Sequence, residues 1–586
     1  MAERTTRRSQ SVVPFGVGAI VEFEDEALMA AGLDVWPEAG PRLHDERLAA
    51  RLGVREFKEP PPKPETGEHI PGADWVPYVR FPQWHFCSRC RSLKKAELHA
   101  RRRPACDNAH QSPYLRKGQK PCATLPEKKQ LRMVPLRFLV ACPAGHIEDF
   151  PWVEWAHAEK GQPVVRGHGC ENPILYFYPS KIGGLAGLFV SCETCKTRRS
   201  LMGTTGRNGL RGFSCEGHRP WLGAGGKETC TVPPDQSMFV LQRGASNIYF
   251  PIVASSILIP PFSSRVHIVA KRWEKTLTSS RTDGELSRDA FEVVARQERV
   301  DVDQLIAAVQ RGDPSDLDST DETKFRSAEY TALQQERRDD DDLLLCLPQK
   351  IDTYGAPVRD WFASVSLVEK LAETRALTGF SRIDPGVPNP ASLSLERSNW
   401  LPAFRVLGEG IFLGFDTDRL GELAGRNQSR LAPLLQRILA TGRCSLEVSE
   451  ELILIHSLAH VLIKRLSWEA GYGSSSIRER IYTSLSPDHR MAGILLYTAA
   501  GDADGTLGGL VRLGKAKTLE RVLVGALSDA RWCASDPICR DSPGQGPESL
   551  NLAACHACML LPETSCELQN RYLDRRAMVE SFGEHV

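Results

Sequence analysis

The sequence contains no apolar run as long as the roughly 18 residues that a membrane-spanning helix needs. Its first residues, MAERTTRRSQSVV, also lack the apolar core of a secretory signal. These two absences favour a protein that stays in the cytoplasm. Because thiols are kept reduced in that compartment, cysteines in close pairs are expected to bind metal there rather than to form disulfides.

The chain also lacks a net charge of either sign. Its 586 residues include 74 Lys and Arg against 73 Asp and Glu, which leaves a formal net charge of +1. This balance neither indicates nor excludes a nucleic-acid partner, so local patches of charge must decide. The length exceeds the size at which a single hydrophobic core stops growing, and therefore predicts several domains.

Two segments approach known catalytic motifs, and each lacks a residue that the chemistry needs. The segment 509–515 repeats the glycines and the lysine of a phosphate-binding loop, but Ala516 stands where Ser or Thr would bind magnesium. His456 and His460 have the spacing of a metalloprotease motif, but Ser457 replaces the glutamate that acts as general base. We therefore expect no enzymatic activity, and we favour a packed histidine pair over a metal site.

What the sequence does contain is 17 cysteines, with three pairs separated by two residues. A turn of that length brings two sulfurs to one metal ion, and a closed four-thiolate site binds zinc structurally. The first site is predicted at Cys87, Cys90, Cys106 and Cys122, the second at Cys192, Cys195, Cys215 and Cys230, and the third at Cys539, Cys555, Cys558 and Cys566, with Cys533 as a competitor for Cys539.

Cys142 and His146 form a further candidate, less complete than the other three. They follow an apolar segment that predicts a buried strand running into a Cys-x3-His turn. The two residues supply half of a zinc site, which Cys170 and either His157 or His168 would complete. The alternative is a buried thiol beside a histidine that caps a turn.

The segment 87–137 is strongly basic. It holds fourteen Lys and Arg against three Asp and Glu, a local net charge of +11 in a nearly neutral chain. Such a patch attracts phosphate backbones through counterion release, whatever the base sequence. The alternative is a solvated basic face or a docking surface for an acidic protein. The candidate nucleic-acid-binding residues are Lys94, Lys95, Arg101, Arg102, Arg103, Lys128 and Lys129.

The apolar pattern predicts an α+β protein with several domains. The best helix begins after Ser449, an N-cap, and ends at Gly471. Further helices are expected at 367–371 and about 517–531, and strands at 410–415 and 493–498. The predicted segments are 1–79, an N-terminal segment with an extended linker; 80–260, zinc-ribbon-like modules with the basic patch; 261–400, a charged helical insertion and connector with an acidic block at 339–342; and 401–586, a C-terminal mixed α/β domain with the last cysteine group.

Several further motifs are spread over nearly the whole chain, the charged insertion excepted. They are Arg8-Ser9-Gln10 with Phe15-Gly16, Cys142-Pro-x-Gly-His146 with Asp149-Phe150-Pro151-Trp152, Gln242-Arg-Gly-Ala-Ser-Asn247, Gly408-Glu-Gly-Ile-Phe412, His456-x3-His460, and Ala554-Cys-His-Ala-Cys558 with Glu563-x2-Cys566-Glu567. This combination resembles the DrmB family, the zinc-binding, helicase-associated subunits of the DISARM anti-phage defence systems of bacteria. The C-terminal third is similar to the helicase-associated, metal-binding domain that trails many superfamily 2 helicases.

The resemblance implies a non-catalytic subunit in a heterodimer with a DrmA-like helicase, which carries the ATPase motifs. The pair would bind foreign DNA in antiviral defence, with structural Zn²⁺ as the cofactor and no membrane partner. Two alternatives stay open. One is a metal-dependent nucleic-acid hydrolase that uses His456 and His460, or Cys142 and His146, as ligands. The other is a protein-binding adaptor whose basic patch meets an acidic partner.

Overall fold

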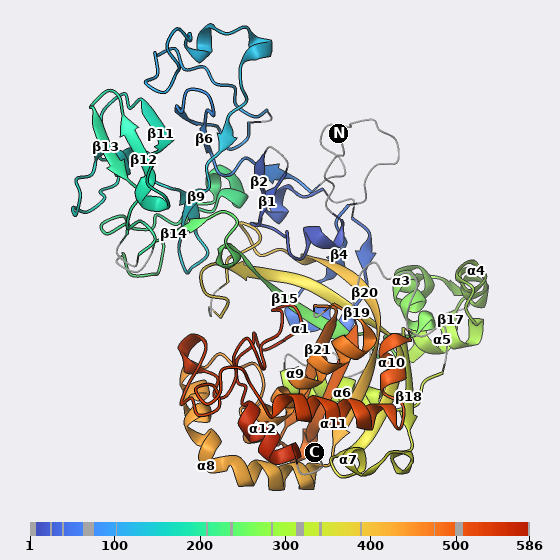
Figure 1. Ribbon diagram of the computed structural model, residues 1–586. Helices are drawn as coiled ribbons and strands as arrows, with labels where there is room; N and C mark the ends of the chain where they lie inside the picture. Colours follow the sequence, from blue (N-terminus) through green and yellow to red (C-terminus); the bar gives the residue numbers. More distant parts are fainter. Residues whose placement is uncertain are drawn as a thin grey trace. The chain divides into compact units, whose positions relative to one another are not determined.

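The computed structural model describes residues 7–23, 26–37, 40–61, 76–100, 102–206, 209–234, 238–282, 285–311, 321–338, 343–386, 390–473, 475–498 and 508–583. The chain forms two compact units, of which the first comprises residues 1–42, 58–254 and 376–404 and the second residues 43–57, 255–375 and 405–586. Helices and strands both contribute (Figure 1). This confirms the predicted α+β, multidomain fold class with zinc-ribbon-like cysteine modules.

Short antiparallel strands dominate the first unit. Apart from the ends of longer strands, its described residues form four three-stranded sheets. Strands this short bury little apolar surface, so each sheet depends on other contacts for stability. The sheets contain β1 (Ile20–Glu22), β2 (Ala27–Ala30) and β5 (Tyr78–Val79); β7 (Leu93–Lys95), β6 (Trp84–Phe86) and β8 (Val134–Pro135); β10 (Ile147–Asp149), β9 (Phe138–Ala141) and β14 (Phe239–Gln242); and β11 (Leu175–Pro179), β12 (Leu188–Cys192) and β13 (Thr197–Ser200).

One part of the first unit has an aromatic core and another has almost none. Phe138 of β9 packs with Phe150, and with Trp152 and Trp155 of α2 (Trp152–His157). In the module 87–133, by contrast, the buried cluster consists of four cysteines and a methionine, namely Cys87, Cys90, Cys106, Cys122 and Met133. The stability of that module therefore depends on the link between its four sulfur atoms.

The second unit is built on a sheet with the strand order β15-β19-β20-β22-β21, in which β18 pairs with β19. β20 pairs antiparallel with β22, and β22 pairs with β21 over its full length. The strands are β15 (Phe250–Ile257), β18 (Leu344–Gln349), β19 (Phe362–Ser381), β20 (Trp400–Phe415), β21 (Ile477–Ser484) and β22 (Met491–Thr498). The short β4 (Glu56–Lys58) pairs with β20, and β3 (Arg42–Leu43) pairs with β4, whereas β16 (Arg281–Thr282) and β17 (Glu285–Leu286) form a separate two-stranded sheet.

Helices cover both faces of this sheet. Ile411 and Leu413 of β20 pack in the cluster that includes α8, α9, α11 and α12, whereas Phe412 between them packs in a second cluster with α6 (Figure 1). The helices are α1 (Glu46–Leu52), α3 (Arg265–Ser279), α4 (Arg288–Glu298), α5 (Val302–Arg311), α6 (Glu322–Leu333), α7 (Ala356–Arg359), α8 (Thr417–Thr441), α9 (Glu450–Ala470), α10 (Gly509–Leu513), α11 (Thr518–Ala530) and α12 (Arg575–Phe582).

α9 has the bounds that its capping residues predict. Ser449 Oγ accepts a hydrogen bond of 3.2 Å from Leu452 N, and Gly471 ends the helix with a left-handed φ of 72°. The helix is buried on nearly all sides, because it contacts β21 and β22 as well as α8, α11 and α12. Three polar side chains on it, His456, Ser457 and His460, are therefore fully buried.

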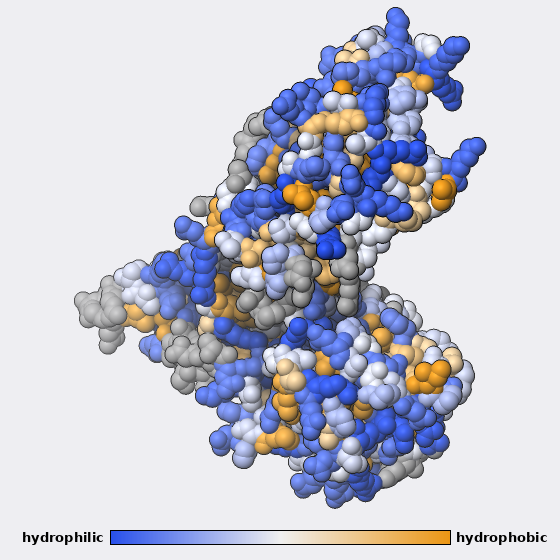
Figure 2. Space-filling view, turned by 90° about the vertical axis from the view of Figure 1, so that its left-hand side faces the viewer, coloured by the Kyte–Doolittle hydropathy of each residue, from blue (hydrophilic) through white to orange (hydrophobic). Residues whose placement is uncertain are grey.

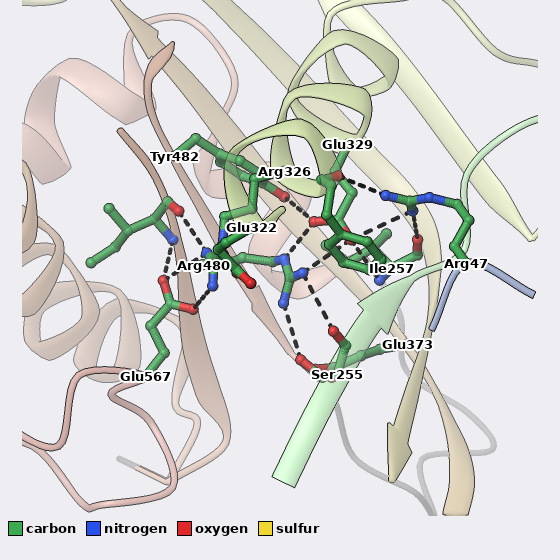
Figure 3. A network of polar contacts seen from close by, with 12 residues as sticks. Arg47, Ser255, Ile257, Glu322, Arg326, Glu329, Glu373, Arg480, Tyr482 and Glu567 are labelled. Atoms are coloured by element: carbon green, nitrogen blue, oxygen red, sulfur yellow. Dashed lines mark hydrogen bonds and ion pairs between the residues drawn. The ribbon is translucent and has the colours of Figure 1, made fainter. Parts of the chain in front are cut away.

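Buried charges join α6 to the sheet (Figure 3). Arg326 is 7% exposed and binds Glu567 through contacts of 3.1 and 3.0 Å, and Glu329 is fully buried beside Arg480. The charged insertion predicted from the sequence contains α3 to α6, but Arg326 and Glu329 of α6 face the protein interior instead of the solvent. The acidic block at 339–342 lies outside the described residues.

The prediction of a helix at 367–371 is wrong, because these residues belong to β19. Leu367, Val368 and Leu371 fit a helical spacing over this short stretch. β19, however, is buried on both faces, with Val368 and Leu371 in one cluster and Val365 in the other. In a strand buried on both faces, apolar and polar residues no longer alternate, so a short window does not separate helix from strand.

The two units cut across the four segments predicted from composition. Segment 1–79 contributes residues 43–57 to the second unit, and segment 261–400 contributes residues from 376 on to the first. Segment 80–260 belongs to the first unit up to residue 254, and segment 401–586 to the second from residue 405 on. Most of the expected linker, residues 62–75, lies outside the described residues.

The surface is mainly polar. Among the described residues, no helix has both the length and the hydrophobicity to cross a membrane. On the face shown in Figure 2, hydrophilic side chains predominate and hydrophobic ones occur in small separate groups.

Candidate metal centres

Fifteen of the 17 cysteines lie in five groups of potential metal ligands, and none of the 17 forms a disulfide. Within each group the donor atoms lie within 4.8 Å of one another. Four groups contain three or four cysteines each. Site 1 is Cys87, Cys90, Cys106 and Cys122; site 2 is Cys142, His146, Cys215 and Cys230; site 3 is His157, Cys170, Cys192 and Cys195; and site 4 is Cys533, Cys539, Cys555 and Cys558.

The separations between sulfur atoms fit zinc. Tetrahedral ligands with Zn–S bonds of about 2.3 Å place the sulfurs about 3.8 Å apart, whereas a disulfide bond is only about 2.05 Å long. In site 1 the Sγ atoms are 3.5 Å apart for Cys90 and Cys106 and 4.0 Å apart for Cys87 and Cys122. In sites 2 to 4 they are 3.5 to 3.7 Å apart. The prediction of structural zinc is confirmed.

Site 1 forms where β6 turns into β7. Cys87 follows β6 directly, and the turn closes with a hydrogen bond of 2.9 Å from Arg91 N to Cys87 O. Cys90 N then donates to Cys87 Sγ at 3.5 Å, as in a zinc knuckle. Arg89 donates to Cys122 Sγ at 3.1 Å, which partly offsets the negative charge that four thiolates carry.

Site 2 is centred on the loop between β9 and β10. Cys142 and His146 stand at its two ends, and Cys142 N donates to His146 O at 2.9 Å. His146 Nδ1 is 3.4 Å from Cys215 Sγ, and Cys142 Sγ is 3.5 Å from Cys230 Sγ. Hydrogen bonds from Cys142 and His146 lower the pKa of the Cys215 thiol to about 4, although burial opposes them. That sulfur is therefore a thiolate at neutral pH, the form that binds metal.

Two polar contacts orient the site 2 loop. His146 Nε2 lies 2.8 Å from Glu228 Oε1, which directs Nδ1 toward the three sulfurs, the usual arrangement behind a metal-bound histidine. Arg382 is fully buried and donates to Gly145 O at 3.0 Å. Burial lowers the pKa of Arg382 to about 9. Glu228 and Arg382, which are not metal ligands, thus fix the position of the loop.

Site 3 takes its histidine from α2. His157 Nδ1 donates to Val153 O at 2.7 Å, one turn earlier, so that Nε2 is left facing the cysteines. His157 Nε2 is buried close to Cys192, and Cys192 Sγ lies 3.7 Å from Cys170 Sγ. A zinc ion bound to Nε2 would give this buried nitrogen a partner.

Site 4 joins two loops near the C-terminal end. Cys533 Sγ lies 3.5 Å from Cys555 Sγ, and Cys539 Sγ lies 3.7 Å from Cys558 Sγ. Arg575 of α12 donates to Asp536 Oδ1 at 2.6 Å, which fixes the first loop on the helix. The metal would therefore link the loops to the main core of the second unit.

The structure groups several ligands differently from their spacing in the sequence. Site 1 contains the four cysteines that were expected together. The second predicted set is divided: Cys192 and Cys195 meet His157 and Cys170 in site 3, whereas Cys215 and Cys230 meet Cys142 and His146 in site 2. His168 belongs to none of the groups found among the described residues. β12 and β13 carry Cys192 and Cys195 to α2, which explains the exchange.

The last predicted set is also divided. Both Cys533 and Cys539 belong to site 4, whereas Cys566 lies beside the histidine pair of α9. Its Sγ is 3.3 Å from His456 Nε2, and Glu479 of β21 completes this fifth group together with His460. Glu479 was not a candidate from the sequence. The available signal was its place in Ile-Arg-Glu-Arg-Ile, where charged residues interrupt an apolar strand.

The candidate DNA-binding side chains lie on the module that site 1 holds together. Lys95 and Arg102 are exposed, as are Lys128 and Lys129, whereas Lys94 forms an ion pair with Asp107. Arg103 is half-buried, and Arg101 lies outside the described residues. The module thus presents several exposed cations around a core of cysteines.

The segment that mimics a phosphate-binding loop already holds a carboxylate. Residues 509–513 form α10, and Glu409 lies at its N-terminal end. Glu409 is fully buried and accepts hydrogen bonds from Gly508 N at 2.6 Å, Leu510 N at 2.9 Å and Val511 N at 3.3 Å. These are the amides that would face a phosphate. Glu409 occupies them.

Comparisons with known proteins support a zinc site at the position of site 4. A family model described as the MrfA Zn-binding domain matches residues 458–559, which include all four ligands of site 4. A model described as a domain of unknown function, DUF8724, matches residues 7–250, which include sites 1 to 3. A curated protein from Bacillus paralicheniformis described as "DISARM protein DrmB" is 31% identical over 544 residues, with 86% of this chain and 89% of the relative covered.

Proposed function

We propose that this chain, which belongs to the DrmB family of DISARM proteins, is the zinc-stabilised, non-catalytic partner of a DrmA-like superfamily 2 helicase. In this role it helps the complex to bind foreign DNA during bacterial antiviral defence. The complex is a heterodimer in the cytoplasm. The helicase docks on the second unit, and the module 87–133 of the first unit meets DNA.

Zinc has a structural role in this proposal. Each of sites 1 to 4 offers four ligands, which leaves no coordination position for water or substrate. In the module 87–133 the ligands are also most of the buried core, so the metal replaces apolar packing. Metal binding in small zinc modules contributes folding free energy on the order of 10 kcal/mol or more.

Two features of the second unit support a non-catalytic role. Glu409 occupies the backbone amides that a nucleotide phosphate would need. The His456–His460 pair is fully buried, and the hydroxyl of Ser457 accepts a hydrogen bond of 2.9 Å from Asp574 N instead of serving a water molecule. ATP hydrolysis is therefore assigned to the helicase.

DNA binding is assigned to exposed cations of the first unit. Their exposure on a basic module is the observation that carries the proposal. Lys95, Arg102, Lys128 and Lys129 extend from a module whose local net charge is strongly positive. Phosphate contacts of this kind carry no base specificity but hold a protein on a nucleic-acid backbone. Such phosphate contacts are therefore compatible with a helicase complex of any base-sequence preference.

A salt titration tests this assignment. Binding of labelled DNA to the chain, and to its complex with the helicase, is measured by fluorescence anisotropy between about 50 and 200 mM salt. Changing Lys95, Arg102, Lys128 and Lys129 to Gln is expected to weaken binding and to reduce the slope of log K against log salt by roughly 3. The matched control changes four exposed cations of the second unit, Lys275, Arg296, Arg512 and Arg540, to Gln.

The outcomes separate the alternatives. Equal affinity and slope for the two quadruple variants would contradict DNA binding by the module. If the first variant instead loses its protein partner and DNA binding is unaffected, the chain is an adaptor. Magnesium-dependent cutting of DNA by the purified chain, lost in His460→Ala, would favour the hydrolase. Co-elution of the chain with a DrmA-like helicase in size-exclusion chromatography tests the partnership itself.

A further inference from the structure

We propose that His456, His460, Glu479 and Cys566 form a fifth zinc site, buried in the second unit between α9, β21 and the segment that follows site 4. The proposal goes beyond the function given above and does not rest on it. His456 and Cys566 are 110 residues apart in the sequence, so the site would close a long loop of the chain.

The donor atoms converge on one point. His456 Nε2 lies 3.3 Å from Cys566 Sγ and 3.1 Å from Glu479 Oε1, and His460 Nε2 lies 3.6 Å from the same carboxylate oxygen. Zinc bonds of about 2.0 to 2.3 Å to N, O and S in a tetrahedron place the ligands about 3.2 to 3.8 Å apart. The observed separations agree with this range to within about 0.1 Å.

Several buried polar atoms of the group have no hydrogen-bond partner. Neither oxygen of Glu479 forms a hydrogen bond, and neither does His460 Nε2, although all three atoms are buried. The two imidazole rings stand at 88° to each other, with centroids 4.5 Å apart. Buried polar atoms normally have partners, and ligands of a metal ion point at the ion instead of at each other. A zinc ion would give His460 Nε2 and one oxygen of Glu479 the partner that each lacks.

A contact behind the group fixes one histidine in the form that binds metal. His460 Nδ1 donates to Met559 O at 2.9 Å, which leaves the unprotonated Nε2 facing Glu479. Metal-bound histidines usually donate their second ring N–H to a carbonyl or a carboxylate in this way. Met559 follows Cys558 directly, so the same short segment supplies a ligand of site 4 and this supporting carbonyl.

Charge neutrality favours an ion at this position. His456, His460, Glu479 and Cys566 are between 0% and 4% exposed. A carboxylate buried this deeply needs a positive partner. Arg478 and Arg480 flank Glu479 in β21, but successive side chains of a strand point to opposite faces, and Arg480 pairs with Glu329 on the α6 side. Zn²⁺ with one thiolate and one carboxylate would make a neutral group.

Such a site is structural. Four protein ligands fill a tetrahedral shell, and complete burial leaves no path for a substrate. The spacing of His456 and His460 matches a metalloprotease helix, yet the residues that complete the set, Glu479 and Cys566, close the coordination shell. The expected consequence of the metal is to hold α9, β21 and the C-terminal segment together.

Anomalous diffraction at the zinc absorption edge tests the proposal on the unaltered protein. Crystals of the full chain, or of its complex with the helicase, purified without added zinc, are expected to give five peaks. The fifth should lie about 2.0 to 2.3 Å from the four donor atoms. Peaks at sites 1 to 4 alone would overturn the proposal, and so would a fifth peak that belongs to another metal.

Elemental analysis of two serine variants provides a matched comparison. Cys566→Ser is expected to lose one of five zinc ions per chain. Cys346→Ser is the control, because Cys346 is equally buried in the second unit but donates to Leu333 O at 3.1 Å and belongs to no ligand group among the described residues. Equal zinc content in both variants and in the unaltered chain would overturn the proposal. If Cys566→Ser does not fold, the diffraction measurement decides.

Discussion

Arg480 and Glu329 form an ion pair with two contacts inside the second unit, where their exposed fractions are 3% and 0%. Arg480 Nε donates to Glu329 Oε2 at 2.6 Å, and Arg480 Nη2 donates to Oε1 at 3.0 Å. Glu329 also accepts from Tyr482 and from Ile257 N (Figure 3). The pair links β21 to α6 and β15 on the face of the sheet opposite α9.

Replacing this arginine is expected to be strongly destabilising. Arg480→Met leaves the Glu329 carboxylate buried without its main partner, which costs about 3 to 5 kcal/mol. The measurement is the urea midpoint, followed by fluorescence at constant zinc concentration. The control is Arg338→Met, because Arg338 pairs with Glu336 at the surface with 76% of its side chain exposed, and a change below about 0.5 kcal/mol is expected there.

A double variant separates the lost charge partner from lost packing. Arg480→Met combined with Glu329→Gln removes both charges of the pair but keeps a side-chain acceptor for Tyr482, for Ile257 N and for Arg47, which lies 3.7 Å from Glu329. The double variant should therefore be more stable than Arg480→Met alone. Equal stability of the two would mean that the arginine acts through its volume.

Loss of one ligand of site 4 is expected to unfold its two loops. Cys558→Ser should release one zinc ion per chain and make residues 533–558 more sensitive to proteases, because it opens the four-ligand site that joins the two loops. The control is Cys444→Ser, at a cysteine that belongs to no ligand group among the described residues. A Cys558→Ser protein that keeps its metal content and still binds its partner would contradict the structural role.

The division of the upstream cysteines has its own test. In Cys215→Ser, the other two sulfurs of site 2, Cys142 and Cys230, should become reactive toward an alkylating agent, whereas Cys170 and Cys192 of site 3 stay protected. Mass spectrometry of the alkylated peptides gives the answer. The reverse pattern, with Cys192 exposed and Cys142 protected, would restore the grouping that the spacing predicts.

Removal of metal should affect the two units unequally. The module 87–133 has a buried cluster of four cysteines and Met133, whereas α9 and β22 contribute to an extensive hydrophobic core. A zinc chelator should therefore expose the module to limited proteolysis first, while the sheet of the second unit remains protected. Simultaneous cleavage in both units would show that their stabilities are coupled.

Local signals were enough to predict α9 and the fold class. Ser449 and Gly471 cap the helix through contacts with residues three or four positions away, so their effect is written in the neighbouring sequence. β22 could also be predicted from local sequence, because its apolar run is continuous. For β19, the pairing partners are distant and both faces are buried, and a five-residue window misassigns it as a helix.

The ligand groups show the same limit. Cys87 and Cys90 are joined by a turn, which their spacing specifies. Cys142 follows β9 and Cys230 precedes β14, which pairs with β9, and 88 residues separate the two cysteines. Glu479 reaches His456 through the packing of β21 on α9. Such contacts depend on tertiary structure, and no local pattern of residues predicts them.

The ligands of site 2 enclose those of site 3 in the chain, because Cys142 and His146 precede His157 while Cys215 and Cys230 follow Cys195. During synthesis on the ribosome, which proceeds from the N-terminus, the inner site therefore has all its ligands before the outer one. Cys142 and His146 must wait for their partners while other thiols emerge. We therefore expect the correct set of zinc ions to depend on when metal is delivered to the nascent chain as well as on how much is delivered.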